Sequence, residues 1–233
     1  MNSLKKTARM AGFLYLAYFA TFIFADNGVH YTAVEPVDGA AIAHNIMASE
    51  QLFRIGFVSF VLAAVFFLLA AWALYVLLKP VNKDLALLFV LLNLGGVAIK
   101  CASLFCEFAA LLLLSGADYL QVFQADQLQA LAILFLNLYK NGFMIAQIFF
   151  GAWLLPLGYL VFKSGFLPRI LGILLIIDGF AMLIWFFQFF LFPGYEVIST
   201  LCLAESFIAE ASLCLWLVIK GVKDQKPALI EAS

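Results

Sequence analysis

Long apolar segments alternate with short polar ones along almost the whole chain. About 20 consecutive apolar residues are enough for a helix to cross the hydrocarbon layer of a membrane, and several of these segments exceed that length. The pattern therefore predicts an all-α, polytopic membrane protein with six transmembrane helices. The spans are predicted at residues 8–25, 52–78, 85–114, 139–162, 170–192 and 200–219.

The fourth apolar stretch, at 128–162, is longer than a membrane is thick. Its 35 residues would extend for about 52 Å as one helix, whereas the hydrocarbon layer is about 30 Å thick. We therefore expect the part before Tyr139 to project from the bilayer, or the helix to bend near Asn141 and Gly142. Pro156 can add a kink.

The first span follows three basic residues and so has the layout of a signal peptide. The residues just before Asp26 read Ile-Phe-Ala, which places a bulky side chain where a cleavage site needs a small one. We expect this span to be kept as a helix. A polar loop at 26–50 follows, with a short helix that Asp38 can cap. Residues 1–220 are predicted to form a single domain and 221–233 a polar cytoplasmic tail.

The positions of lysine and arginine predict the orientation. In a six-span arrangement, ten of the thirteen basic residues fall on the side that carries both termini. The opposite loops contain acidic residues and no lysine or arginine. Cytoplasmic loops carry the excess of Lys and Arg, so both termini are predicted to be cytoplasmic. The ten residues are Lys5, Lys6, Arg9, Lys79, Lys83, Lys163, Arg169, Lys220, Lys223 and Lys226.

The composition supports the assignment to membrane proteins and limits the kinds of binding partner. The chain is 66% hydrophobic and 12% charged, and its mean hydropathy is +1.08. Soluble domains average about 45–50% hydrophobic residues and about 25% charged residues. Its net charge of −1 provides no basic stripe for phosphates, which argues against nucleic acid as a partner. The lipid bilayer is the expected partner, and protein partners are not indicated.

The third span carries one polar face. Asn93, Gly96, Lys100, Ser103 and Glu107 are spaced by three or four residues, so they share one side of a helix. A charged side chain at the centre of a membrane helix costs about 2.5–3.5 kcal/mol. The polar face is therefore predicted to meet other helices or water, and the apolar remainder to meet lipid.

Ionisable residues also occur within the other spans. With Lys100 and Glu107 of the third span they number seven, three positive and four negative side chains. This is close to neutrality, so we expect them to pair or to line water. Together with two amide side chains within the spans they form the candidate ligand-binding cluster. Its members are Arg54, Asn93, Lys100, Glu107, Lys140, Gln147, Asp178, Glu205 and Glu210.

Several kinds of chemistry find no support in the sequence. The two histidines, His30 and His44, lie in or near the first outer loop, so neither a three-histidine zinc site nor a haem within the membrane can be assembled from them. Ser206 beside Glu205 has no histidine base within the membrane, and no glycine-rich phosphate loop follows a strand. We predict no metal, no cofactor and no catalytic residue.

The four cysteines all lie inside apolar runs and are interpreted as small hydrophobic residues rather than a disulfide framework. A bridge between Cys106 and Cys202 is the alternative, because both could lie in the outer leaflet. The full set is Cys101, Cys106, Cys202 and Cys214.

The buried charges allow three interpretations. They can form ion pairs that only hold the bundle together, as in a structural subunit of a membrane complex. They can line an outward-opening polar pocket for a small anionic or zwitterionic molecule or a lipid headgroup. Alternatively, Asp178, Glu205 and Glu210 can relay protons in a transporter. A membrane-embedded transferase or hydrolase would need a nucleophile or metal constellation that is not found.

Several motifs resemble those of a bacterial membrane protein family known as domain of unknown function 4386. The resemblance covers most of the chain, from Lys5 to the sixth span, and implies a multi-pass protein of the bacterial inner membrane. The family has no settled activity, so the resemblance implies no catalytic residue, and Lys100, Lys140 and Asp178 fall outside the shared pattern. The motifs are at 48–54, 75–83, 142–143, 149–151, 158–160 and, most closely, 164–172.

Overall fold

The computed structural model describes residues 3–26 and 45–223, and all regular elements in these ranges are helical. Six helices are long and apolar enough to cross a membrane, which confirms the predicted fold class and number of spans within the described part. They are α1 (Ser3–Ala25), α4 (Glu50–Leu78), α5 (Lys83–Leu114), α6 (Ala125–Lys163), α7 (Arg169–Leu191) and α8 (Glu196–Ile219), with a short 3-10 helix, η2 (Asp118–Leu120), between α5 and α6.

The fourth span is one continuous helix that begins well before Tyr139. A capping box fixes its start, because the Gln124 and Gln127 side chains each accept a hydrogen bond from the other residue's backbone N–H. The 39 residues of α6 extend for about 58 Å. The predicted short helix after Asp38 lies outside the described residues, as do His30 and His44.

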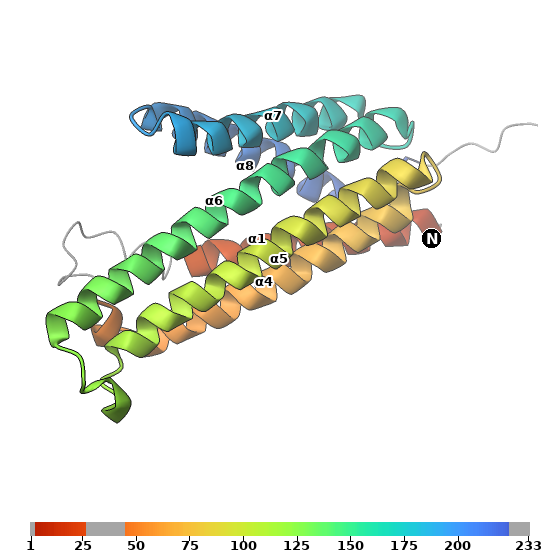
Figure 1. Ribbon diagram of the computed structural model, residues 1–233. Coiled ribbons are helices and arrows are strands. Elements are labelled where there is room, and N and C mark those ends of the chain that lie inside the picture. The colour runs from red at the N-terminus through yellow and green to blue at the C-terminus, as the bar shows by residue number, and fades with distance from the viewer. Residues whose placement is uncertain (1–2, 27–44, 224–233) are drawn as a thin grey trace, which may run out of the picture.

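The six helices form a closed ring, because each helix contacts its neighbours in the sequence and α8 returns to contact α1. Figure 1 shows the helices from the side. At this closing contact Gly12 lies against α8, where a Cβ added to the glycine would be 2.8 Å from the backbone N of Val218. The Cys214 thiol also donates to the Gly12 carbonyl oxygen at 3.5 Å. The first and last spans are therefore joined by direct backbone packing.

Short turns join α4 to α5 and α6 to α7, so consecutive helices run in opposite directions. The end of the ring that holds these turns also holds the start of α1 and the end of α8, and we call it the basic end. Among the described residues it contains Lys5, Lys6, Arg9, Lys79, Lys83, Lys163, Arg169, Lys220 and Lys223.

Two pairs of glycines bring α6 and α7 into close contact. A Cβ added to Gly151 would lie 2.9 Å from the carbonyl oxygen of Gly179, and one added to Gly158 would lie 2.7 Å from that of Gly172. The glycines of each pair are one heptad from those of the other, so they stay on the facing sides of both helices. Small residues at such positions let membrane helices approach backbone to backbone.

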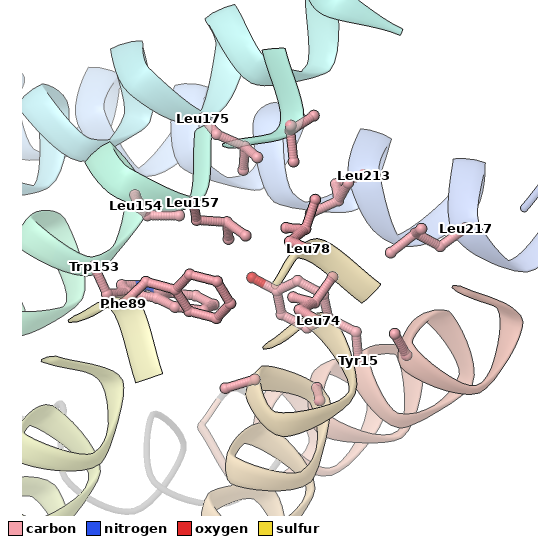
Figure 2. Packing of buried hydrophobic residues seen from close by; sticks show 14 of the residues in the cluster. Tyr15, Leu74, Leu78, Phe89, Trp153, Leu154, Leu157, Leu175, Leu213 and Leu217 are labelled. Atoms are coloured by element: carbon pink, nitrogen blue, oxygen red, sulfur yellow. The ribbon is translucent and has the colours of Figure 1, made fainter. Parts of the chain in front are cut away.

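Leucines fill the half of the ring next to the basic end (Figure 2). They come from α4, α6, α7 and α8 and pack together in the interior. This leucine-filled half consists of Leu74, Leu78, Leu154, Leu157, Leu175, Leu213 and Leu217.

Three helices extend beyond the others at the end opposite to the basic end. From the basic end, α1, α7 and α8 have 23, 23 and 24 residues, whereas α4, α5 and α6 have 29, 32 and 39. The longer three therefore project by about 9–24 Å. A separate apolar cluster holds the extension together: Ile46, Phe53, Ala110, Leu111, Ala132 and Leu136.

Substituting Gly172 by alanine should destabilise the protein. The new Cβ would lie 2.6 Å from both the Gly158 carbonyl oxygen and the Phe162 backbone N, and overpacking of this kind costs about 1–3 kcal/mol. The thermal midpoint of the purified protein in detergent measures this loss. Gly194→Ala is the matched control, because nothing lies within 4 Å of its added Cβ. Equal midpoints for the two variants would show that the close approach of α6 and α7 is not required.

The basic end is predicted to face the cytoplasm because lysine and arginine are concentrated there. Single cysteines introduced on a background without native cysteines can test this orientation. In intact cells, a membrane-impermeant maleimide should label Val122→Cys, between η2 and α6, and should not label Pro80→Cys, in the α4–α5 turn. Both positions are exposed in the structure, so both should react after permeabilisation. The reverse pattern in intact cells would overturn the orientation.

Candidate functional site

The polar face of α5 points into the protein. Asn93, Lys100 and Glu107 are 0%, 7% and 2% exposed. Ser103, also buried, packs so closely on α6 that a Cβ at Gly142 would collide with its side chain. The polar face is thus covered by a neighbouring helix, as the cost of placing charge against acyl chains requires.

The Lys100 ammonium lies among three aromatic rings from three other helices. Its Nζ is 4.0 Å from the ring centroid of Phe22 on α1, 4.9 Å from that of Phe143 on α6 and 5.4 Å from that of Phe60 on α4. Ring faces carry negative potential and attract a cation, most strongly where water is absent. The three phenylalanines, here called the aromatic box, therefore hold the ammonium inside the ring of helices.

Two carboxylates complete the surroundings of Lys100. Asp26, next to the end of α1, and Glu107, two turns along α5, are the acidic residues whose charge acts on the ammonium. Both also act on the buried Tyr139 of α6. All three residues lie farther from the basic end than Lys100 does, because each is closer to the opposite end of its own helix.

A second group of polar residues lies between α1, α7 and α8. The Tyr15 hydroxyl donates to Oε2 of Glu210 at 2.5 Å. Asp178 is fully buried, and the charges of Glu210 and Glu205 act on it. Within the described part of the chain neither Asp178 oxygen has a partner at hydrogen-bond distance, although the Ser206 hydroxyl is near enough to interact with it. We call Tyr15, Asp178, Glu205 and Glu210 the acidic group.

Arg54 and Lys140 do not join either group. Arg54 pairs with Glu50, one turn earlier on its own helix, at 2.8 Å, and its side chain remains 42% exposed. Lys140 is exposed, with Nζ 5.8 Å from the ring centroid of Phe189 on α7. Gln147 lies two turns further along α6 and is only 6% exposed. Lys140 is exposed and Gln147 is buried, although both lie on the same face of α6. The reason is that α6 diverges from α7 toward its N-terminal end (Figure 1), so this face is covered at Gln147 and uncovered at Lys140.

The aromatic members of both groups were not expected from the sequence. Phe22, Phe60 and Phe143 are three of 26 phenylalanines, and nothing in the sequence distinguishes them from residues that face lipid. Tyr15 could have been identified from the sequence, because a hydroxyl within an apolar span needs a hydrogen-bond partner when it is buried. The four cysteines are free thiols, so Cys106 and Cys202 are not bridged.

Six apolar helices of spanning length, with charges buried between them, define this chain as a multi-pass membrane protein. It belongs to the family described as domain of unknown function DUF4386, whose model matches residues 10–221. A relative from Archaeoglobus fulgidus, described as an uncharacterized protein, is 32% identical over 153 residues, which cover 66% of this chain and 75% of the relative. No solved structure matches the chain. The resemblance to this family is thus confirmed.

Replacing Tyr15 by phenylalanine removes the hydrogen bond to Glu210 and keeps the ring. We expect a loss of about 1–2 kcal/mol, since a buried acceptor is left without its donor, measured as a lower thermal midpoint in detergent. Tyr159→Phe is the control, because that side chain is 45% exposed. In a double-mutant cycle with Glu210→Gln the two effects should be less than additive. Full additivity would show that the bond contributes nothing.

Proposed function

We propose that this protein binds a small anionic or zwitterionic molecule, or the headgroup of a lipid, at Lys100 inside the ring of helices. The observation that carries the proposal is the buried ammonium in the aromatic box, 4.0–5.4 Å from three ring centroids. A ring face attracts the positive charge but is a weak acceptor, so the N–H donors of the ammonium remain suited to oxygen atoms of a ligand.

The distribution of polar residues supports access from the end opposite to the basic end. The leucine-filled half closes the interior next to the basic end, whereas Asp26, Glu107 and Tyr139 lie on the far side of Lys100. With the basic end in the cytoplasm, this arrangement makes an outward-opening site in a bacterial cytoplasmic membrane. The two carboxylates would favour a zwitterion over a simple anion, because they can accept its cationic part.

A second function is favoured by the acidic group. The Tyr15–Glu210 hydrogen bond next to Asp178 is an arrangement in which protons can be exchanged between neighbouring oxygen atoms, as proton-coupled transport of a small solute requires. Such a transporter would show uptake or efflux in proteoliposomes that depends on a pH gradient and is lost in Asp178→Asn. A structural subunit would instead co-purify with a stable partner.

Lys100→Met should weaken ligand binding by at least tenfold, because a charge-assisted hydrogen bond contributes more than the 1.4 kcal/mol that corresponds to a factor of ten. The probe is dioleoylphosphatidylglycerol, with binding to the purified full chain followed by native mass spectrometry. Glycerol 3-phosphate, tested in parallel, distinguishes a free small anion from a lipid headgroup. Dioleoylphosphatidylethanolamine adds the zwitterionic case.

Lys140→Met is the matched control. It removes the same charge from a neighbouring helix, but from an exposed side chain outside the aromatic box. We expect this variant to bind the probes as the unsubstituted protein does. If Lys100→Met and Lys140→Met bind all three probes equally well, Lys100 is not a ligand anchor and the proposal fails.

A further inference from the structure

An open groove lies on the outer face of α1, close to the basic end. Its volume is about 570 Å³, within the range of small-molecule sites, about 300–1,000 Å³. Met10 and Phe13 are 52% and 58% exposed, whereas Tyr15, on the opposite face of the helix, is fully buried in the ring. The groove therefore faces the membrane and not the interior of the protein. We call it the α1 groove, and its lining residues are Lys6, Arg9, Met10, Phe13 and Leu14.

The basic and the apolar residues of the groove lie at different levels along the helix. Lys6 and Arg9 are in the first two turns of α1, and Phe13 and Leu14 follow one to two turns later. The 23 residues of α1 extend for about 35 Å, slightly more than the hydrocarbon layer of about 30 Å. The first turns therefore reach the level of the lipid headgroups, and the later lining residues lie among the acyl chains.

The wall of the groove is almost entirely apolar. Lys6 and Arg9 therefore line it with the methylene groups of their side chains, an arrangement in which the charged ends extend toward the headgroups or water. A ligand that fits both parts has an apolar chain beside Phe13 and a negative charge at the level of Lys6. An anionic phospholipid has this form, whereas a free anion would gain nothing from the apolar wall.

The surroundings of the groove are positively charged. The end of α8 packs beside α1, because a Cβ added to Gly221 would lie 3.2 Å from Cγ of Lys5 and 3.8 Å from Cγ of Arg9. This contact brings the preceding residue, Lys220, to the same region. Among the described residues of the basic end only Asp84 is acidic, and it belongs to α5, whereas α1 packs on α4 and α8. Each basic residue near an anionic membrane surface strengthens binding about fivefold.

We infer that the α1 groove is a binding site for an anionic phospholipid. The headgroup phosphate accepts hydrogen bonds from Lys6 and Arg9, and one acyl chain lies along Met10, Phe13 and Leu14. This site is on the outside of the ring of helices, whereas the site proposed at Lys100 is inside it. With the basic end in the cytoplasm, the bound lipid belongs to the inner leaflet.

Photoreactive lipids can test this site, because they report where they bind. The purified full chain is placed in dioleoylphosphatidylcholine nanodiscs with a small share of phosphatidylglycerol that carries a diazirine in one acyl chain. Mass spectrometry identifies the cross-linked residues. Cross-linking at Met10, Phe13 and Leu14 should be at least tenfold stronger than with the matching phosphatidylcholine probe, which has no net charge. At Ile23 and Phe24, exposed near the other end of α1, the two probes should react alike.

Competition separates a lipid site from a site for a free anion. Excess dioleoylphosphatidylglycerol should displace the probe from the groove, and excess glycerol 3-phosphate should not. Displacement by glycerol 3-phosphate would overturn the inference in favour of a free anion. Equal reaction of the two probes in the groove would show ordinary lipid contact, and no reaction of either would show that something other than lipid covers the groove. Both results would also overturn it.

Lys6→Glu locates the headgroup part of the site. It should lower the preference for phosphatidylglycerol in the groove at least tenfold, since it replaces an attraction by a repulsion. Lys83→Glu is the matched control, because it makes the same change in an exposed lysine of the basic end that lies outside the groove. This variant should keep the preference. Equal losses in the two variants would show that the whole basic end attracts the lipid and would refute the groove. The measurement is confined to α1, so its result does not depend on whether Lys100 binds a ligand.

Discussion

The absence of water in the hydrocarbon layer is the constraint on which this structure depends. A lysine ammonium facing acyl chains would cost several kcal/mol, so Lys100 is enclosed by rings from α1, α4 and α6. The same constraint applies to the acidic group, where Tyr15 reaches Glu210 across the α1–α8 contact. Both enclosures need helices that are distant in the sequence to lie side by side, and the closed ring supplies them. The ring of helices must therefore close for these charged side chains to be buried.

Helix α6 has a central position in this arrangement because it contacts both α5 and α7. It packs on α5 along both halves, from Gly142, which admits the Ser103 side chain, to Phe150, which lies against Gly96. Its later half also packs on α7 through Gly151 and Gly158. Phe143 lies between these contacts and closes one side of the aromatic box. The length of α6 thus has a structural reason: one rigid helix links the projecting part of the bundle to the α7–α8 pair.

Much of this architecture could be predicted from residue patterns, because a membrane imposes a length and a polarity on every span. The polar face of α5 was predicted to be buried, and its residues are. The position of Lys140 was not predictable in the same way. It shares a face with Gln147, but whether that face is covered depends on how far α7 follows α6. The choice of Phe22, Phe60 and Phe143 among many phenylalanines likewise depends on tertiary packing, which helical periodicity does not contain.

The leucine-filled half has an electrical consequence. A layer of closely packed leucines has a low dielectric constant, so most of a transmembrane voltage falls across it. A full crossing is worth about 2.3 kcal/mol per elementary charge at 100 mV. Lys100 lies beyond this insulating layer, where a solvated interior would be nearly equipotential with the compartment it faces. Occupancy at the aromatic box would then be insensitive to membrane potential. A charge that passed the leucines toward the basic end would instead experience nearly the whole field.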